Sequence, residues 1–185
     1  MIEIQVLDQT ASIHQSWILN QYIIDVPIPL TSFVEFAGCD SGSVNMGLAK
    51  LYSVDDKDRA MLWQMKLERS SNPIERIRLA ADIWFKFYKA EKPDFLTIEN
   101  AAYAKGFRQV ELAEQRAIIA WLCMIDVGYN QVQMVAPMTI RKKVFSSGKI
   151  KAHEAWQLAG IPKNKQPSDA LAALSCAYYG MMKGE

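Results

Sequence analysis

The spacing of apolar residues along this 185-residue chain changes near residue 73. Before that point, short apolar runs bounded by polar or glycine-containing turns predict strands. After it, apolar residues from Ile74 to Tyr88 recur at helical spacing, and further strands then alternate with helices. The predicted strands are residues 33–39, 46–54, 61–67, 95–98 and 131–136; the predicted helices are residues 73–92, 109–125 and a last one from 168, with a basic loop or short helix at 141–149.

This order predicts one α/β domain built on a mixed sheet. The first two strands are joined by a short connection containing Gly42, which favours an antiparallel hairpin, and the alternation that follows favours parallel strands. We therefore expect a five-stranded sheet, with three antiparallel strands and then parallel ones, flanked by helices over residues 32–185. Residues 1–31, which contain Pro27 and Pro29, are expected to form an N-terminal extension that packs on the domain or a partner, or covers a sheet edge.

Charge is distributed unevenly along the chain. Half of the residues are apolar and 22% are charged, which supports a sizeable core and excludes global disorder. The formal net charge is only +1, yet residues 1–40 hold five acids and no Lys or Arg, whereas residues 104–165 hold ten Lys or Arg and four acids. A basic half of this kind can bind a polyanion while acids elsewhere bind cations.

Cysteines and histidines give no sign of a zinc site. Cys39, Cys123 and Cys176 lie in apolar stretches without C-x-x-C spacing, which is typical of buried free thiols, and His14 and His153 lack metal-ligand spacing. No run reaches the ~18 apolar residues of a membrane span, and the N-terminus resembles neither a signal nor a transit peptide. We expect a soluble, cytoplasmic protein that does not bind membranes.

Three carboxylates occupy positions where chemistry could occur. Asp40 and Glu99 each end an apolar strand, and Asp169 lies in the first turn of the last helix. If the two strands are parallel neighbours, Asp40 and Glu99 lie side by side, and the last helix could bring Asp169 to them. Such a group would need divalent cations to stay ionised. Taken singly, each has a structural explanation: Asp169 complements the helix dipole, Asp40 is a turn residue, and Glu99 ends a strand.

Four segments in order carry a family resemblance: FAGCDSG at 36–42 with Gly47, IENAAYAK at 98–105 with LAEQRA at 112–117, VAPMTIRKKV at 135–144 followed by Gly148 and Lys149, and SDALAAL at 168–174. They resemble the motifs of the RuvC-type Holliday junction resolvases, which have an RNase H-like fold. The resemblance covers about residues 33–180 and leaves residues 1–31 outside it.

The resemblance implies a metal-dependent endonuclease that acts as a homodimer on four-way DNA junctions, each subunit nicking one of two opposed strands. Asp40, Glu99 and Asp169 fall on the metal-binding and catalytic positions, for which two Mg²⁺ ions, or Mn²⁺ in their place, are expected. A bacterial cell or a phage-infected bacterium is the implied location. The expected DNA contacts are phosphate contacts from Lys105, Arg116, Arg141, Lys142, Lys143 and Lys149, and stacking or core packing by Tyr103 and Phe107.

Other functions stay open at this stage. Many family members carry an acid where this chain has Gln166, which leaves the number of metal ions unsettled and keeps a non-catalytic junction-binding protein in view. Another RNase H-like nuclease (YqgF-type, an RNA–DNA hybrid nuclease or a transposase core) shares parts of the pattern. The spacing D-x-G-x-x-x-x-G at 40–47 also fits the phosphate loop of actin-like ATPases, but those proteins need two such domains, for which 185 residues are too few.

Overall fold

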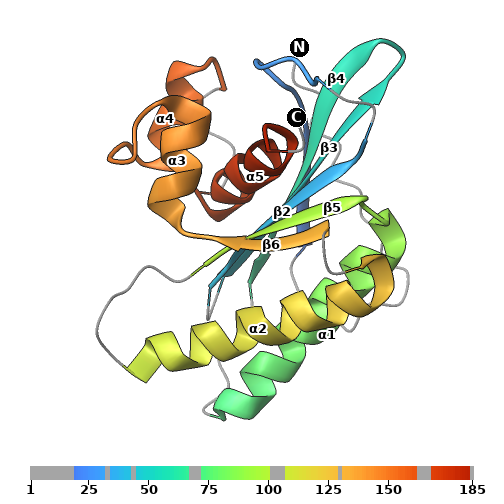
Figure 1. Cartoon of the computed structure of the whole chain (residues 1–185), viewed down its shortest axis with the longest axis vertical. Coiled ribbons are helices and arrows are strands. Elements are labelled where there is room, and N and C mark those ends of the chain that lie inside the picture. Colours follow the sequence, from blue (N-terminus) through green and yellow to red (C-terminus); the bar gives the residue numbers. More distant parts are fainter. Residues whose placement is uncertain are drawn as a thin grey trace.

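The computed structural model describes residues 19–31, 34–42, 45–66, 72–100, 107–128, 131–161 and 168–183. Six strands and five helices lie within these ranges (Figure 1). In chain order they are β1 (Leu19–Asp25), β2 (Phe36–Ser41), β3 (Asn45–Val54), β4 (Lys57–Lys66), α1 (Pro73–Glu91), β5 (Phe95–Glu99), α2 (Phe107–Val127), β6 (Val132–Val135), α3 (Pro137–Phe145), α4 (Ala152–Leu158) and α5 (Ser168–Met181).

The strands form one mixed sheet in the order β1-β4-β3-β2-β5-β6. The pairs β1–β4, β4–β3 and β3–β2 are antiparallel, and the pairs β2–β5 and β5–β6 are parallel. The predicted mixed α/β sheet is therefore confirmed, but the count of five strands is wrong by one. The sixth strand is β1, which pairs with β4 from Leu19 opposite Met65 to Asp25 opposite Arg59. It lies within the predicted N-terminal extension, and it covers the edge that β4 would otherwise expose.

Helices cover both faces of the sheet (Figure 1). On one face, Trp84 of α1 and Ile119 of α2 pack in a core with Cys39 of β2. On the other face, α5 packs its apolar residues against β2, β3 and β4, and α3 and α4 lie against α5. The contact between α5 and β2 is close because β2 carries Gly38; a Cβ there would lie 1.9 Å from the carbonyl oxygen of Ala173. Small residues thus let the last helix lie directly on the sheet.

Most predicted helices agree with the structure. Asn72 caps α1 by accepting a hydrogen bond from the Ile74 amide at 3.0 Å, and Pro93 follows its C-terminal end. The basic segment contains helix α3, so the short-helix alternative is confirmed and the helix begins earlier, at Pro137. The three cysteines are buried free thiols, as predicted. No helix in the described part of the chain is long and apolar enough to cross a membrane.

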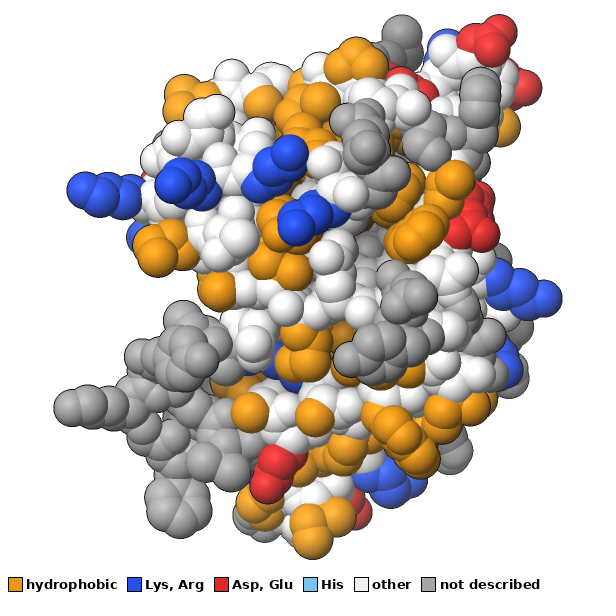
Figure 2. All heavy atoms as spheres, viewed as in Figure 1, with side chains coloured by type: hydrophobic (Ala, Val, Ile, Leu, Met, Phe, Trp, Pro, Cys, Tyr) orange, Lys and Arg blue, Asp and Glu red, His pale blue; other side chains and the backbone are white. Residues whose placement is uncertain are grey.

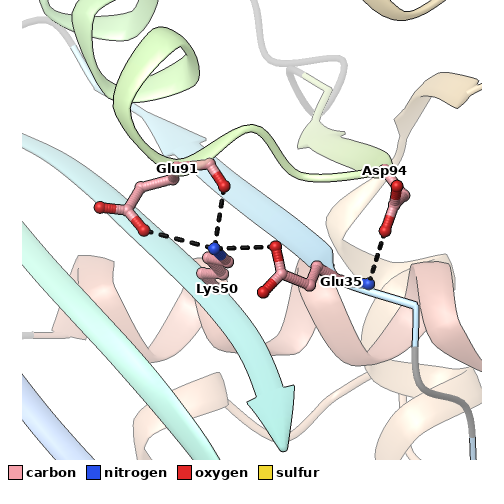
Figure 3. Close-up of polar contacts among 4 residues, drawn as sticks. All are labelled: Glu35, Lys50, Glu91 and Asp94. Carbon is pink, nitrogen blue, oxygen red and sulfur yellow. Dashed lines mark hydrogen bonds and ion pairs between the residues drawn. The ribbon is translucent and has the colours of Figure 1, made fainter.

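A buried lysine on β3, Lys50, connects the sheet to the C-terminal end of α1 (Figure 3). The Lys50 ammonium on β3 lies 2.9 Å from a carboxylate oxygen of Glu35, donates to the Glu91 carbonyl oxygen at 2.8 Å, and lies 3.4 Å from the Glu91 carboxylate. Its side chain is largely buried, whereas Glu35 is partly exposed. One cation therefore joins β3, the start of β2 and the C-terminal end of α1, where carbonyl oxygens lack helical donors.

We expect Lys50→Met to destabilise the protein. The substitution leaves the partly buried Glu91 group without its cation, at a cost of about 2 kcal/mol, which lowers Tm by about 4–8 °C for a chain of this size. Thermal unfolding followed by circular dichroism measures the change. Lys57→Met is the matched control, because Lys57 is exposed at the β3–β4 turn; equal Tm values for the two variants would show that the Lys50 contacts do not stabilise the fold.

Candidate functional site

Two of the three predicted carboxylates end adjacent parallel strands. Cys39 of β2 is paired with Ile98 of β5, so the next residues, Asp40 and Glu99, lie side by side at the carboxyl edge of the sheet. Beyond them, Glu99 is paired with Val135 of β6. In Figure 1 these strands end on the left of the view, between α3 above and the start of α2 below. Parallel pairing, with no local motif, brings together two acids that are 59 residues apart in the sequence.

The third carboxylate reaches the same row from the last helix. Asp40 is paired with Gly47 of β3, and Gly47 is paired with Gln64 of β4. The backbone of Asp169 lies directly on Gly47, where a Cβ would come within 2.0 Å of the Asp169 carbonyl oxygen. The Gln64 amide donates to a carboxylate oxygen of Asp169 at 2.9 Å. We call the residues Glu99, Asp40, Gly47 and Gln64, with Asp169 above them, the carboxylate row.

The carboxylates of the row influence one another electrostatically. Burial, together with the negative charges of Glu99 and Asp169 and against the opposing charge of Arg116, raises the pKa of Asp40 to about 8. The pKa of Glu99 is also raised, chiefly by burial and in part by Asp169, while Arg116 and Arg141 oppose the shift. Raised pKa values on adjacent acids are frequent at functional sites, because ionising such groups together requires a counter-charge.

The donor set of the row suits a hard divalent cation. Carboxylate oxygens are the ligands that Mg²⁺ and Mn²⁺ prefer, and a cation among these acids would remove their mutual repulsion. As the side chains stand, no group of three or more His, Cys, Asp or Glu within the described ranges is arranged to hold a metal ion. Simultaneous coordination by Asp40, Glu99 and Asp169 would therefore require at least one of their side chains to adjust.

Two residues of α2 that contact Ser41, next to Asp40 of the row, were not identified as supports of the site from the sequence. Arg116 is only 5% exposed, and its Nη2 donates to the Ser41 carbonyl oxygen at 2.9 Å. The neighbouring Gln115 donates to the Ser41 hydroxyl at 2.8 Å. One contact holds the backbone and the other the side chain of Ser41, which directly follows Asp40. A phosphate contact was predicted for Arg116, but its guanidinium lies inside the protein in this structure. There its positive charge opposes the rise in the pKa of Asp40 and of Glu99.

The similarity of this chain to known proteins lies in its fold. No protein-family model matches the sequence, and no curated protein matches it. Thermus thermophilus RuvC matches with a TM-score of 0.65 at 16% identity, over 82% of this chain and 95% of that one. The chain has the RuvC fold. The same protein in complex with a Holliday junction substrate matches with a TM-score of 0.64 at 14% identity, again over 82% of this chain and 95% of that one. The yeast mitochondrial Holliday junction resolvase Ydc2 matches with a TM-score of 0.55 at 11% identity, over 83% of this chain and 80% of that one.

The other residues that were predicted to contact DNA differ in their exposure. Lys142, Lys143 and Lys149 are exposed on α3 and the loop after it. Figure 2 shows Lys and Arg side chains gathered over the part of this face where α3 and α4 lie. Arg141 is half-buried and donates to the carbonyl oxygens of Pro137 and Ile150, each at 3.2 Å. Tyr103, Lys105 and Gln166 lie outside the described residues, as does the side chain of Phe107, which begins α2.

Proposed function

We propose that this protein is a metal-dependent endonuclease that resolves four-way DNA junctions by paired nicks. The observation that carries the proposal is the carboxylate row, in which Asp40, Glu99 and Asp169 meet at one edge of a RuvC fold. Support also comes from the exposed lysines of α3, which lies beside the same edge. A phosphodiester could reach the acids while its neighbouring phosphates contact the lysines.

Each part of the site has a separate task in this proposal. Asp40, Glu99 and Asp169 would hold one or two Mg²⁺ ions, or Mn²⁺ in their place, whose chemistry is to activate water and to stabilise the leaving oxygen of a phosphodiester. Arg116 is a fixed internal cation that favours the ionised forms of Asp40 and Glu99. Gln115 and Arg116 together hold the end of β2, so that the position of Asp40 does not depend on the substrate.

In this proposal, the exposed Lys142 and Lys149 contact DNA phosphates. We expect Lys142→Ala or Lys149→Ala to weaken junction binding and to reduce the slope of log K against log salt by up to about one unit each, because each phosphate contact releases about one counterion. Fluorescence anisotropy at several salt concentrations measures the slope. Lys57→Ala, at the distant β3–β4 turn, should leave it unchanged; an unchanged slope in a test variant would remove that lysine from the DNA contacts.

A homodimer follows from the need for two cuts. One chain provides one carboxylate row, so paired nicks in opposed strands require two copies. On α2, Ile118, Trp121 and Ile125 follow helical spacing and form an exposed apolar stripe, in which Trp121 and Ile125 are each 63% exposed. We call it the α2 stripe. A large exposed tryptophan flanked by aliphatic side chains is typical of the centre of a protein interface, and the same stripe on two copies could pair about a two-fold axis.

Substrate choice tests this proposal against other nucleases. The protein is incubated in Mg²⁺ with a synthetic four-way junction, a linear DNA duplex of the same sequence and an RNA–DNA hybrid. We expect cleavage of the junction alone. Cleavage of the hybrid would indicate an RNA–DNA hybrid nuclease, and junction binding without cleavage in Mg²⁺ or Mn²⁺ would indicate a non-catalytic binding protein; either result would refute the proposed activity.

A further inference from the structure

Gln64 stands out among the polar residues of the sheet. It lies on β4 in the carboxylate row, opposite Gly47, inside the apolar run Met61–Met65. Its Nε2 donates to a carboxylate oxygen of Asp169 at 2.9 Å across a separation of 105 residues. Its Oε1 is buried and accepts no hydrogen bond from the residues that the structure describes. A half-buried amide with one open acceptor is costly, so this position is poorly explained by packing alone.

The chemistry of an amide suits this place better than the alternatives. A glutamate at position 64 would put a second negative charge 2.9 Å from Asp169 and repel it. A lysine or arginine would neutralise Asp169 and compete with a cation for it. The amide of Gln64 instead orients the carboxylate by a neutral hydrogen bond and leaves its charge available.

Two contacts together determine where Asp169 lies. Gly47 lets the first turn of α5 lie on β3, which places the backbone of Asp169, and Gln64 then fixes the side chain. Strand pairing places the backbones of Asp40 and Glu99 in the row. Within the described residues, Asp169 is the one acid of the three whose carboxylate accepts a hydrogen bond, and Gln64 donates it.

We propose that Gln64 is a positioning residue of the carboxylate row, which holds Asp169 in the orientation needed to bind a divalent cation. This inference rests on the proposed metal-dependent activity and assigns to it a residue outside the three acids. Groups that orient metal ligands typically change metal affinity by 10–100-fold when removed. Because Gln64 acts through Asp169, its effect should disappear when Asp169 cannot bind the cation.

The test measures Mn²⁺ binding to the free protein by calorimetry and by electron paramagnetic resonance, without DNA. We expect Gln64→Leu to weaken Mn²⁺ binding about tenfold, and to slow junction cleavage while the junction Kd stays within about twofold of wild type. Gln133→Leu is the matched control, because Gln133 is also half-buried on a strand and donates at 2.9 Å, but to the Thr97 hydroxyl. It should leave Mn²⁺ affinity unchanged, and thermal unfolding confirms that both variants fold.

A double-mutant cycle separates positioning from general damage. In an Asp169→Asn background, Gln64→Leu should change Mn²⁺ affinity by less than about twofold. A tenfold loss in both backgrounds, an equal loss in Gln133→Leu, or no loss in Gln64→Leu would each overturn the role of Gln64. A wild-type protein that binds no Mn²⁺ would instead refute the proposed metal-dependent function itself, so the two failures are distinguishable.

Discussion

Asp40→Asn should lower the rate of junction cleavage by at least about a thousandfold while junction binding persists. Asp40 lies at the centre of the row, between Glu99 and Gly47, and an amide at this position can neither carry the negative charge nor coordinate a cation as a carboxylate does. Glu99→Gln and Asp169→Asn should act in the same direction. Single-turnover cleavage measures the rate, and anisotropy in EDTA measures binding. A variant that cuts at near wild-type rate would exclude its carboxylate from the site.

The same substitution should stabilise the protein when no divalent cation is bound. The folded-state pKa of Asp40 is raised to about 8 from 3.8, so its contribution to stability is greatest below pH 4 and is lost as the pH rises through 8. In EDTA at pH 8, we expect Asp40→Asn to have a Tm about 4–8 °C above that of wild type, which corresponds to a gain of about 2 kcal/mol in the free energy of unfolding. At pH 5 this difference in Tm should be smaller. Mg²⁺ should raise the Tm of wild type more than that of the variant. Equal pH dependence in the two proteins would contradict the electrostatic account of the row.

Trp121→Glu should convert a dimer into monomers. A charged side chain at the centre of the α2 stripe replaces apolar burial by desolvation of a carboxylate, at a cost of at least about 2 kcal/mol, or about thirtyfold in the dimer dissociation constant. Sedimentation velocity measures this change. We expect the variant to nick junctions singly at concentrations where wild type makes paired nicks.

Leu158→Glu provides the control for this experiment. Leu158 is 83% exposed on α4, on the opposite face of the sheet from α2, so the variant also exchanges an exposed apolar side chain for a charge. It should leave the oligomeric state unchanged. If Trp121→Glu sediments as wild type does, the α2 stripe is not the dimer interface.

Strand and helix ends were the informative positions in the sequence. The sequence predicted that Asp40 and Glu99 lie side by side, because each follows an apolar strand and parallel neighbouring strands end at the same edge of a sheet. The structure places them in this way. Asp169 could be placed at the start of a helix, but its contact with Gly47 depends on how α5 lies on the sheet. The fold class was therefore predictable from periodicity together with family resemblance.

Three features that were not predicted depend on contacts between distant residues. Strand β1 pairs with β4 about 40 residues later, and its sequence shows no regular alternation of apolar and polar residues. The burial of Arg116 follows from the orientation of α2, which a basic residue in a basic segment does not reveal. Gln64 did carry a signal, since an amide interrupts an apolar strand, but only the register with Gly47 connects it to Asp169.

We expect the carboxylate row to cut both opposed strands of a four-way junction in a cation-dependent reaction. The most direct measurement uses a junction with each strand labelled in turn, incubated with wild type or Asp40→Asn in Mg²⁺ or in EDTA, and maps every nick on a sequencing gel. We predict symmetric nicks in two opposed strands, made by wild type in Mg²⁺ and lost both in EDTA and in the variant. Nicks that persist in EDTA or in Asp40→Asn, or that fall at random along the arms, would contradict this account.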